Sequence, residues 1–179
     1  SANKEIWVKP WIDYYRKRRD EDDRLIQDTK PTDNHWTHDN IRKILILDFK
    51  NNCGYCGDSR PMPRAFNSSK RSQRGHVDHY RAKALYPELT YHWDNYIWSC
   101  ESCNTEKGEF DDQNHPIFNP CEERDCNQLN FIRDTGEYCL REENERLSCK
   151  RFINTDRSTM LNSPQIAKKR KNRVRAIEI

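Results

Sequence analysis

The chain has 179 residues, of which 34% are hydrophobic and 34% are charged, and its formal net charge is +3. The core is therefore expected to be small, and the charge alone does not indicate nucleic acid, because a binding surface needs basic residues gathered in one place. No apolar run is long enough to cross a membrane, and the first residues lack the pattern of an export signal. We therefore expect a cytoplasmic protein with no membrane contact.

The first elements in chain order are an arm and a helix. Residues 1–36 are expected to form an aromatic and charged arm, because a basic block and then an acidic block follow the aromatic residues, which is typical of a solvated helix or arm. A helix is predicted over residues 37–51. It would be capped by Thr37 or Asp39 and would place four apolar residues at roughly helical spacing: Ile41, Ile44, Leu45 and Leu47.

The middle of the chain predicts a loop, two strands and a helix. Residues 58–74 are rich in proline, serine and basic residues, which indicates an exposed loop. Residues 76–80 alternate like a short strand, residues 96–99 give a second strand, and residues 101–108 open a helix. We expect one unit over residues 37–118.

The last part, residues 119–179, is expected to pack a hairpin and a basic helix on that unit. A hairpin is predicted over residues 131–140, because Asp134-Thr135-Gly136 suits a turn with a positive φ angle. Ser163-Pro164 supplies an N-cap followed by proline at the first helical position. The basic run from Lys168 to Arg175 fits either a contact with a nucleic-acid backbone or the polar face of this helix.

Two Cys-x-x-Cys pairs carry the clearest chemical signal. Without an export signal, paired cysteines favour a metal over disulfides. Two such pairs complete the closed tetrahedron of a structural zinc ion, which leaves no open position for catalysis. The sequence therefore predicts one structural Zn²⁺ on Cys53, Cys56, Cys100 and Cys103.

The other four cysteines do not show this spacing. No standard metal-binding turn matches the intervals between them, so we interpret them as buried or free thiols and not as a second zinc site. They are Cys121, Cys126, Cys139 and Cys149.

The segment between the two cysteine pairs contains Gly75-His76-Val77-Asp78-His79-Tyr80 and then Asn95, and Asn104 and Lys107 follow the second pair. This order resembles the HNH family of ββα-metal nucleases, in an HNN variant because asparagine stands at the third position. The resemblance implies an α+β fold. Its ββα-metal core would be stapled by the four-cysteine zinc site and flanked by N- and C-terminal helices.

The residue types suit the hydrolysis of a phosphodiester bond. A histidine with a pKa near 6.5 is suited to deprotonate water, which favours His79 as the general base. Asp78 and Asn104 offer hard oxygen ligands for one catalytic Mg²⁺ or Mn²⁺. The resemblance implies that Asn95 fixes the loop that carries His79. Lys107 shares a helical face with Asn104 and is expected to reach a phosphate. Three further candidates for contacting metal or phosphate are His76, Arg81 and Lys83.

A narrower resemblance rests on the residues around this core. Residues 79–83, 86–95 and 119–123 are similar to the PtuB-type HNH proteins of Septu and retron-associated antiphage systems. This resemblance implies an ATPase partner. The leading hypothesis is a metal-dependent endonuclease that acts on DNA as the effector of a bacterial antiphage system. A ribonuclease with the same site, for example one that cleaves transfer RNA, and a non-catalytic zinc-dependent nucleic-acid-binding module are the alternatives.

Overall fold

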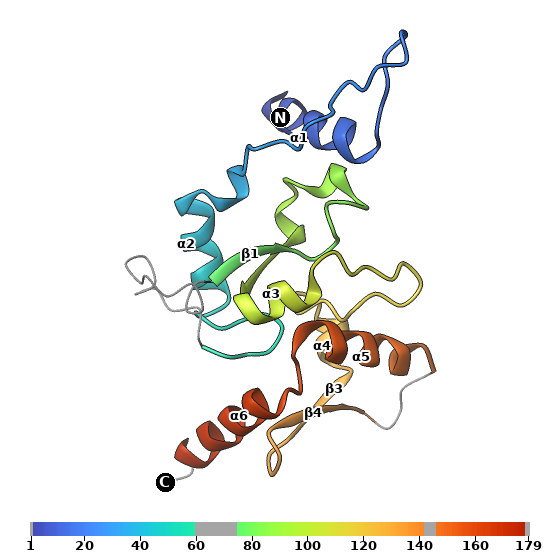
Figure 1. The fold of residues 1–179 in the computed structure, drawn as a ribbon. Helices are drawn as coiled ribbons and strands as arrows, with labels where there is room; N and C mark the ends of the chain where they lie inside the picture. Colours follow the sequence, from blue (N-terminus) through green and yellow to red (C-terminus); the bar gives the residue numbers. More distant parts are fainter. Residues whose placement is uncertain (1, 60–74, 142–145, 178–179) are drawn as a thin grey trace.

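The computed structural model describes residues 2–59, 75–141 and 146–177, and Figure 1 shows the arrangement of their elements. Of the loop expected over residues 58–74, residues 60–74 lie outside the described residues, whereas Asp58 is buried and Ser59 is half-buried. Within the described residues, no helix combines the length and the apolar character that crossing a membrane requires. The α-helices are α1 (Ala2–Tyr15), α2 (Asp39–Asp48), α3 (Glu101–Lys107), α4 (Glu123–Cys126), α5 (Arg146–Thr159) and α6 (Pro164–Ile177).

The strands form two separate antiparallel hairpins, β1 (Gly75–His79) with β2 (Tyr96–Cys100) and β3 (Leu129–Ile132) with β4 (Glu137–Leu140). In the first hairpin, Gly75 pairs with Cys100 and His79 pairs with Tyr96. Every residue of β2 is buried. A side chain at position 75 would collide with the ring of Trp98, which lies 2.0 Å from the place where a Cβ would stand. The ring of a core tryptophan therefore requires glycine at the start of β1.

Helix α3 follows directly on β2, so the chain forms a ββα unit. Its N-cap is Cys100, whose Sγ accepts a hydrogen bond from the backbone N–H of Cys103, and Gly108 ends it with a φ of 49°. The helix expected over residues 101–108 is thus confirmed to within one residue. The predicted α+β class, with a ββα core between N- and C-terminal helices, is also confirmed.

Helix α2 forms where it was expected, but two of the four apolar positions named for it are exposed. Leu45 is buried, and Ile41 and Ile46 pack beside it, whereas Ile44 and Leu47 are 48% and 75% exposed. The N-cap is His38, whose Nδ1 accepts from the N–H of Asn40, in place of the expected Thr37 or Asp39. Helical spacing alone was compatible with more than one buried face of α2, and packing against the aromatic core determines which face is buried.

The aromatic residues of the N-terminal segment belong to that core. Trp11 of α1 and Trp36 of the short 3-10 helix η1 (His35–Thr37) are 1% and 7% exposed, and they pack with Leu45, Tyr96 and Trp98. Helix α1 also lies against the short helix η4 (Pro87–Leu89). Residues 16–26, which include the charged run, are exposed throughout. The aromatic part of the expected arm is therefore packed against the ββα unit.

The C-terminal part closes over the other side of the ββα unit (Figure 1). The predicted hairpin and the helix after Ser163 are both present, and they contact each other at Gly136. Its φ is 79°, and a side chain there would meet the carbonyl oxygen of Ala167 on α6. Helix α5, for which the sequence analysis gave no expectation, packs on α3, and its buried Arg151 pairs with Asp125 at 2.8 Å.

Candidate active site

Four thiols gather where the two cysteine pairs meet, and we call them the cysteine clasp: Cys53, Cys56, Cys100 and Cys103. All four are at most 4% exposed, and their sulfur atoms lie within 4.8 Å of one another. Thiolates 2.3 Å from a tetrahedral zinc ion are ~3.8 Å apart, and the Cys56 and Cys100 sulfur atoms are 3.9 Å apart. The donor set and its spacing therefore fit one closed zinc-type site.

The clasp also ties three parts of the chain together. The N–H of Gly54 donates to the carbonyl of Trp98 at 2.8 Å, which fixes the first cysteine turn to β2. Cys103 lies in the first turn of α3, and its sulfur lies 2.6 Å from the carbonyl oxygen of Thr159 at the end of α5. Hydrogen bonds among the four thiols lower the pKa of Cys53 and Cys100 and raise the pKa of Cys56 and Cys103. A zinc ion would need all four sulfur atoms as thiolates, and its charge would stabilise them.

His79 stands at the far end of β1 from the clasp. It is 5% exposed, and its Nε2 lies 2.9 Å from the carbonyl oxygen of Thr90. Because a carbonyl only accepts, Nε2 carries the proton and Nδ1 carries the lone pair. The edges of Trp36 and Tyr96 pack on the ring at centroid distances of 4.9 and 5.5 Å. The imidazole is therefore held in one tautomer and one orientation.

The charge state of His79 follows from its surroundings. Burial first, and then the neighbouring ammonium of Lys83, lower its pKa to about 3. The ring is consequently neutral at physiological pH, which is the form that can accept a proton from water.

Asn95 closes the loop that follows His79. Its Oδ1 accepts from the backbone N–H of Arg81 at 2.7 Å, and its Nδ2 donates to the carbonyls of Arg81 and Leu89 at 3.1 and 3.2 Å. The carbonyl of Asn95 itself accepts from the N–H of Tyr80 at 2.8 Å. With its side chain 4% exposed, Asn95 contacts backbone and does not face solvent.

Asp78 lies in a buried polar group with Tyr55 and Lys107. Its Oδ2 accepts from the Tyr55 hydroxyl at 2.6 Å and is 3.1 Å from the Lys107 ammonium. That ammonium also donates to the carbonyl of His79 at 2.7 Å. Burial raises the pKa of Asp78, against the opposing effects of Lys107 and Tyr55. Lys107 was expected to reach a phosphate. It is instead 1% exposed, and its ammonium contacts the last two residues of β1.

Asp78 and Asn104 are the proposed oxygen ligands of a hard divalent cation. The Tyr55 hydroxyl and the Lys107 ammonium both approach Oδ2 of Asp78. Asn104 is half-exposed and stands three residues before Lys107, so the two share one face of α3, and that helix contacts β1. A carboxylate and an amide oxygen are ligands that Mg²⁺ and Mn²⁺ accept.

The three further candidates have different surroundings. His76 is half-buried on β1, opposite Ser99. Arg81 pairs with Asp111 at 2.9 Å and lies over the ring of Tyr86, so its charge is already used within the fold. Lys83 lies over the rings of Trp36 and Trp11, at 5.2 and 5.5 Å, close to His79. Of the three, Lys83 is the cation beside the histidine.

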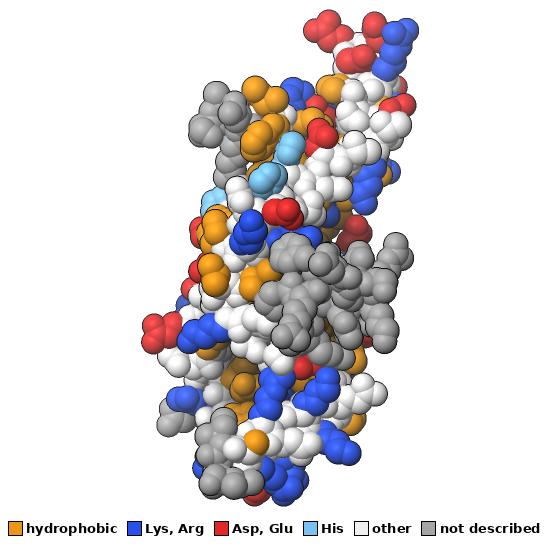
Figure 2. All heavy atoms as spheres, turned by 90° about the vertical axis from the view of Figure 1, so that its left-hand side faces the viewer, with side chains coloured by type: hydrophobic (Ala, Val, Ile, Leu, Met, Phe, Trp, Pro, Cys, Tyr) orange, Lys and Arg blue, Asp and Glu red, His pale blue; other side chains and the backbone are white. Residues whose placement is uncertain are grey.

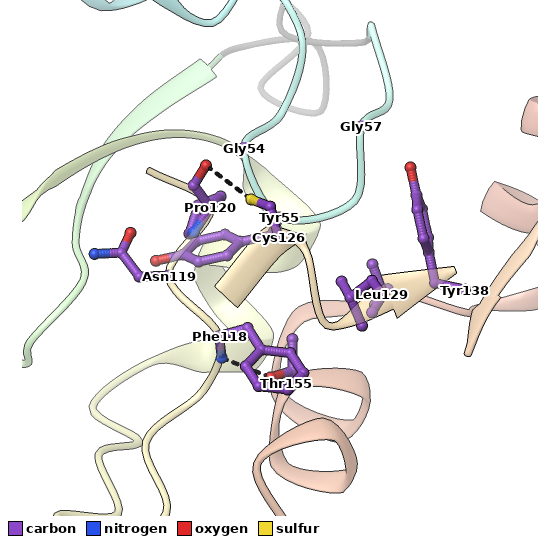
Figure 3. A pocket seen from close by; sticks show the side chains of 11 residues that line it. Gly54, Tyr55, Gly57, Phe118, Asn119, Pro120, Cys126, Leu129, Tyr138 and Thr155 are labelled. Carbon is purple, nitrogen blue, oxygen red and sulfur yellow. Dashed lines mark hydrogen bonds between the residues drawn. The ribbon is translucent and has the colours of Figure 1, made fainter. Parts of the chain in front are cut away.

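Three contacts of the site were not anticipated from the sequence, namely those of Tyr55, Thr90 and Trp36. Tyr55 stands between Cys53 and Cys56, which was a signal that it would lie near the site. Thr90 contributes only its carbonyl, and Trp36 is far away along the chain, so no pattern marks either of them. Tyr55 also borders a mainly apolar cavity of about 250 Å³, shown in Figure 3. Other residues that line it are Phe118, Asn119, Pro120, Leu129, Tyr138 and Thr155.

Two other regions of interest lie apart from the histidine. Within the described ranges, the clasp is the one group of potential metal ligands in which sulfur atoms gather, and the second set of four cysteines does not form another. On α6, Lys169 and Arg173 pair with the buried carboxylate of Asp58, each at 3.2 Å. Part of the basic run therefore fastens α6 to the first cysteine turn.

Comparison with known proteins agrees with this geometry. Residues 53–110 match the profile of the family described as HNH endonuclease, and this range contains the clasp, both strands of the first hairpin and α3. The Septu protein PtuB of Bacillus thuringiensis is 31% identical over 100 residues, which cover 55% of this chain. The match spans 34% of PtuB, or about a third of that protein's length. The segment from Cys53 to Phe110 is therefore similar to the HNH endonuclease family, and 100 residues of the chain are similar to part of PtuB.

Proposed function

We propose that the protein is a metal-dependent endonuclease that hydrolyses phosphodiester bonds in DNA, as the nuclease effector of a bacterial antiphage system. The observation that carries the proposal is the state of His79. Its Nε2 is bound to the carbonyl of Thr90, so its Nδ1 is left as a neutral base, on the residue that follows Asp78 in β1. A fixed imidazole beside hard oxygen donors is an arrangement suited to activating water near a phosphate.

Each residue has a distinct part in this proposal. His79 takes the proton from the attacking water, while Asp78 and Asn104 hold one Mg²⁺ or Mn²⁺, which neutralises charge on the phosphate when it is bound. Asn95 keeps the following loop in place, and Lys107 positions Asp78 and the carbonyl of His79. Zinc in the clasp has a structural part only, because four thiolates fill its coordination sphere.

The wider biological setting rests on the relative. PtuB is named as a Septu protein, and the similarity to it supports an antiphage role. A cytoplasmic location is proposed together with that role. An ATPase partner subunit is proposed on the resemblance to PtuB-type proteins.

The test is cleavage of plasmid DNA and of total RNA with added Mg²⁺. We expect the wild-type protein to cut DNA, and His79→Gln to lose activity by ~10²–10⁴-fold, because glutamine can still donate to Thr90 but cannot act as a base. The matched control is His92→Gln, since the His92 side chain is 44% exposed. Cleavage of RNA alone would replace DNA with RNA as the substrate. Equal cleavage by His79→Gln and wild type would refute the proposed site.

A further inference from the structure

An exposed aromatic group lies close to His79 and takes no part in the proposed chemistry. It consists of Trp7, His35 and Tyr91, and we call it the aromatic surface. The rings of Trp7 and His35 are 4.5 Å apart at an interplanar angle of 32°, and the Tyr91 ring lies 6.0 and 5.8 Å from them. Trp7 is 44% exposed, His35 is exposed and Tyr91 is half-buried. Figure 2 shows hydrophobic and histidine side chains gathered on the upper part of one face of the molecule.

The core does not need this exposed ring. Trp11 and Trp36 already fill the aromatic core at 1% and 7% exposure, whereas Trp7 leaves nearly half of its surface in water. Exposed apolar side chains that gather in one place mark binding surfaces more often than isolated ones do. Tryptophan, tyrosine and histidine are also the side chains on which unpaired bases stack.

The aromatic surface connects to His79 through a continuous series of rings. Trp36 touches His79 at 4.9 Å, and Tyr91 touches Trp36 at 5.5 Å. A nucleic-acid strand rises ~3.4 Å per nucleotide when its bases are stacked, so a strand whose phosphate lies at His79 reaches the aromatic surface within about five nucleotides. The distance therefore suits a short stretch of the strand that is being cut.

The positive charges between His79 and the aromatic surface suit the phosphate backbone of such a strand. Lys83 lies over the ring of Trp36 and close to His79. Burial and then the ammonium of Lys30 lower the pKa of Lys83, against the opposing effects of Asp78 and Glu109. A phosphate group would relieve the repulsion between the two ammonium groups.

We propose that Trp7, His35 and Tyr91 bind unpaired bases of the substrate strand, so that the protein takes its nucleic acid in single-stranded form. This inference rests on the proposed nuclease function and names the class of substrate for it. In a duplex the faces of the bases are covered by their neighbours, and stacking on a protein ring requires an unpaired or displaced base. Deoxyribose and ribose strands share this chemistry, so both are included in the test.

The experiment measures binding without added Mg²⁺, so that no strand is cut. Labelled single-stranded DNA, single-stranded RNA, the matching duplexes and an abasic DNA strand are titrated, and a 2-aminopurine base reports stacking by its quenching. We expect the single strands to bind better than the duplexes and the abasic strand. Trp7→Leu should weaken single-strand binding by ~10-fold and remove the quenching, since stacking contributes about that much per base. Trp7→Phe, which keeps an aromatic ring, should retain most of both.

Trp93→Leu is the matched control, because Trp93 is 42% exposed but packs on Tyr96 and lies outside the aromatic surface. Duplex binding as tight as single-strand binding, or equal losses in Trp7→Leu and Trp93→Leu, would overturn the proposal. The comparison of DNA with RNA identifies the sugar. Stacking without any cleavage in Mg²⁺ would contradict the nuclease and leave the aromatic surface standing. If Trp7→Leu cut duplex DNA as well as the wild type does, the role of the aromatic surface would be contradicted and the nuclease would stand.

Discussion

The two ends of the β1–β2 hairpin carry different chemistry. At one end, Gly75 pairs with Cys100, and four buried sulfur atoms gather in the clasp. At the other end, His79 pairs with Tyr96, and the donors are an imidazole, a carboxylate and, across on α3, an amide. The strand rises ~3.3 Å per residue, so the two ends are about 13 Å apart. In the proposed function, the sulfur ligands would stabilise the fold and the oxygen ligands would face the reaction.

Helix α3 joins the two ends. It begins at the clasp with Cys100 as its N-cap and ends with Lys107, whose ammonium contacts Asp78 and the carbonyl of His79. A metal in the clasp would therefore position the reacting end through one short helix without touching it. This division predicts that changes at the clasp act mainly on stability, whereas changes at the histidine end act mainly on rate.

Loss of the clasp should have the largest effect. A structural zinc ion contributes ~10–16 kcal/mol to folding in small zinc domains, so Cys103→Ser should remove bound zinc and cooperative unfolding together. Elemental analysis and thermal melting followed by circular dichroism measure this. Cys149→Ser is the matched control, because Cys149 is an exposed thiol outside the clasp. Retention of one zinc ion per chain by Cys103→Ser would show that the clasp is not the zinc site.

Asp78 tests whether effects on stability and on rate are separable, because it pairs with the buried Lys107 and is also a proposed metal ligand. Asp78→Asn leaves the ammonium of Lys107 buried at 1% exposure without its counter-charge. Breaking such a buried pair costs ~3–5 kcal/mol. We expect a matching loss in the free energy of unfolding by urea, in addition to loss of cleavage. In the double variant Asp78→Asn with Lys107→Met, much of the stability should return while activity stays absent. Recovery of activity would exclude Asp78 as a metal ligand.

Asn95 should give a smaller loss of stability together with a loss of rate. Asn95→Ala removes the bonds to both backbone groups of Arg81, and a buried group left without a partner costs ~1–3 kcal/mol. Asn95→Asp keeps the acceptor for the N–H of Arg81 and should fall between alanine and the wild type. Urea unfolding and the turnover number on plasmid DNA measure the two effects. A rate unchanged by Asn95→Ala would mean that the loop after His79 does not position the base.

The features foreseen from the sequence are those in which close neighbours along the chain decide the structure. Two residues between cysteines fix a metal-binding turn, so the four members of the clasp were identified correctly. Alternation in residues 76–80 and the Ser163-Pro164 start gave β1 and α6. Such signals depend on local backbone geometry, so they can be interpreted without knowledge of the fold.

The features not foreseen depend on contacts between distant segments. Trp36 lies against His79, and nothing near either residue in the sequence announces this contact. Ile44 and Leu47 were named as apolar positions of α2, but they are exposed, because Trp11 and Trp36 pack with Leu45, Ile41 and Ile46. Lys107 follows the helical spacing from Asn104 as expected, yet it turns inward because Asp78 offers a buried counter-charge. Spacing gives the face of a helix, and tertiary packing decides what that face meets.

Tyr55 provides the smallest test, and it lies between the two ends. Its backbone belongs to the first cysteine turn, while its hydroxyl donates to Asp78 at 2.6 Å. Tyr55→Phe keeps the ring and removes one buried hydrogen bond, which should lower the free energy of unfolding by ~1 kcal/mol. Tyr80→Phe is the matched control, because it removes a hydroxyl that donates to the carbonyl of Ile117 at 2.7 Å, away from Asp78. We expect similar losses of stability in both variants and a change in the Mg²⁺ concentration needed for cleavage in Tyr55→Phe alone. An equal metal requirement in both variants would mean that the first cysteine turn supports the fold without adjusting the carboxylate.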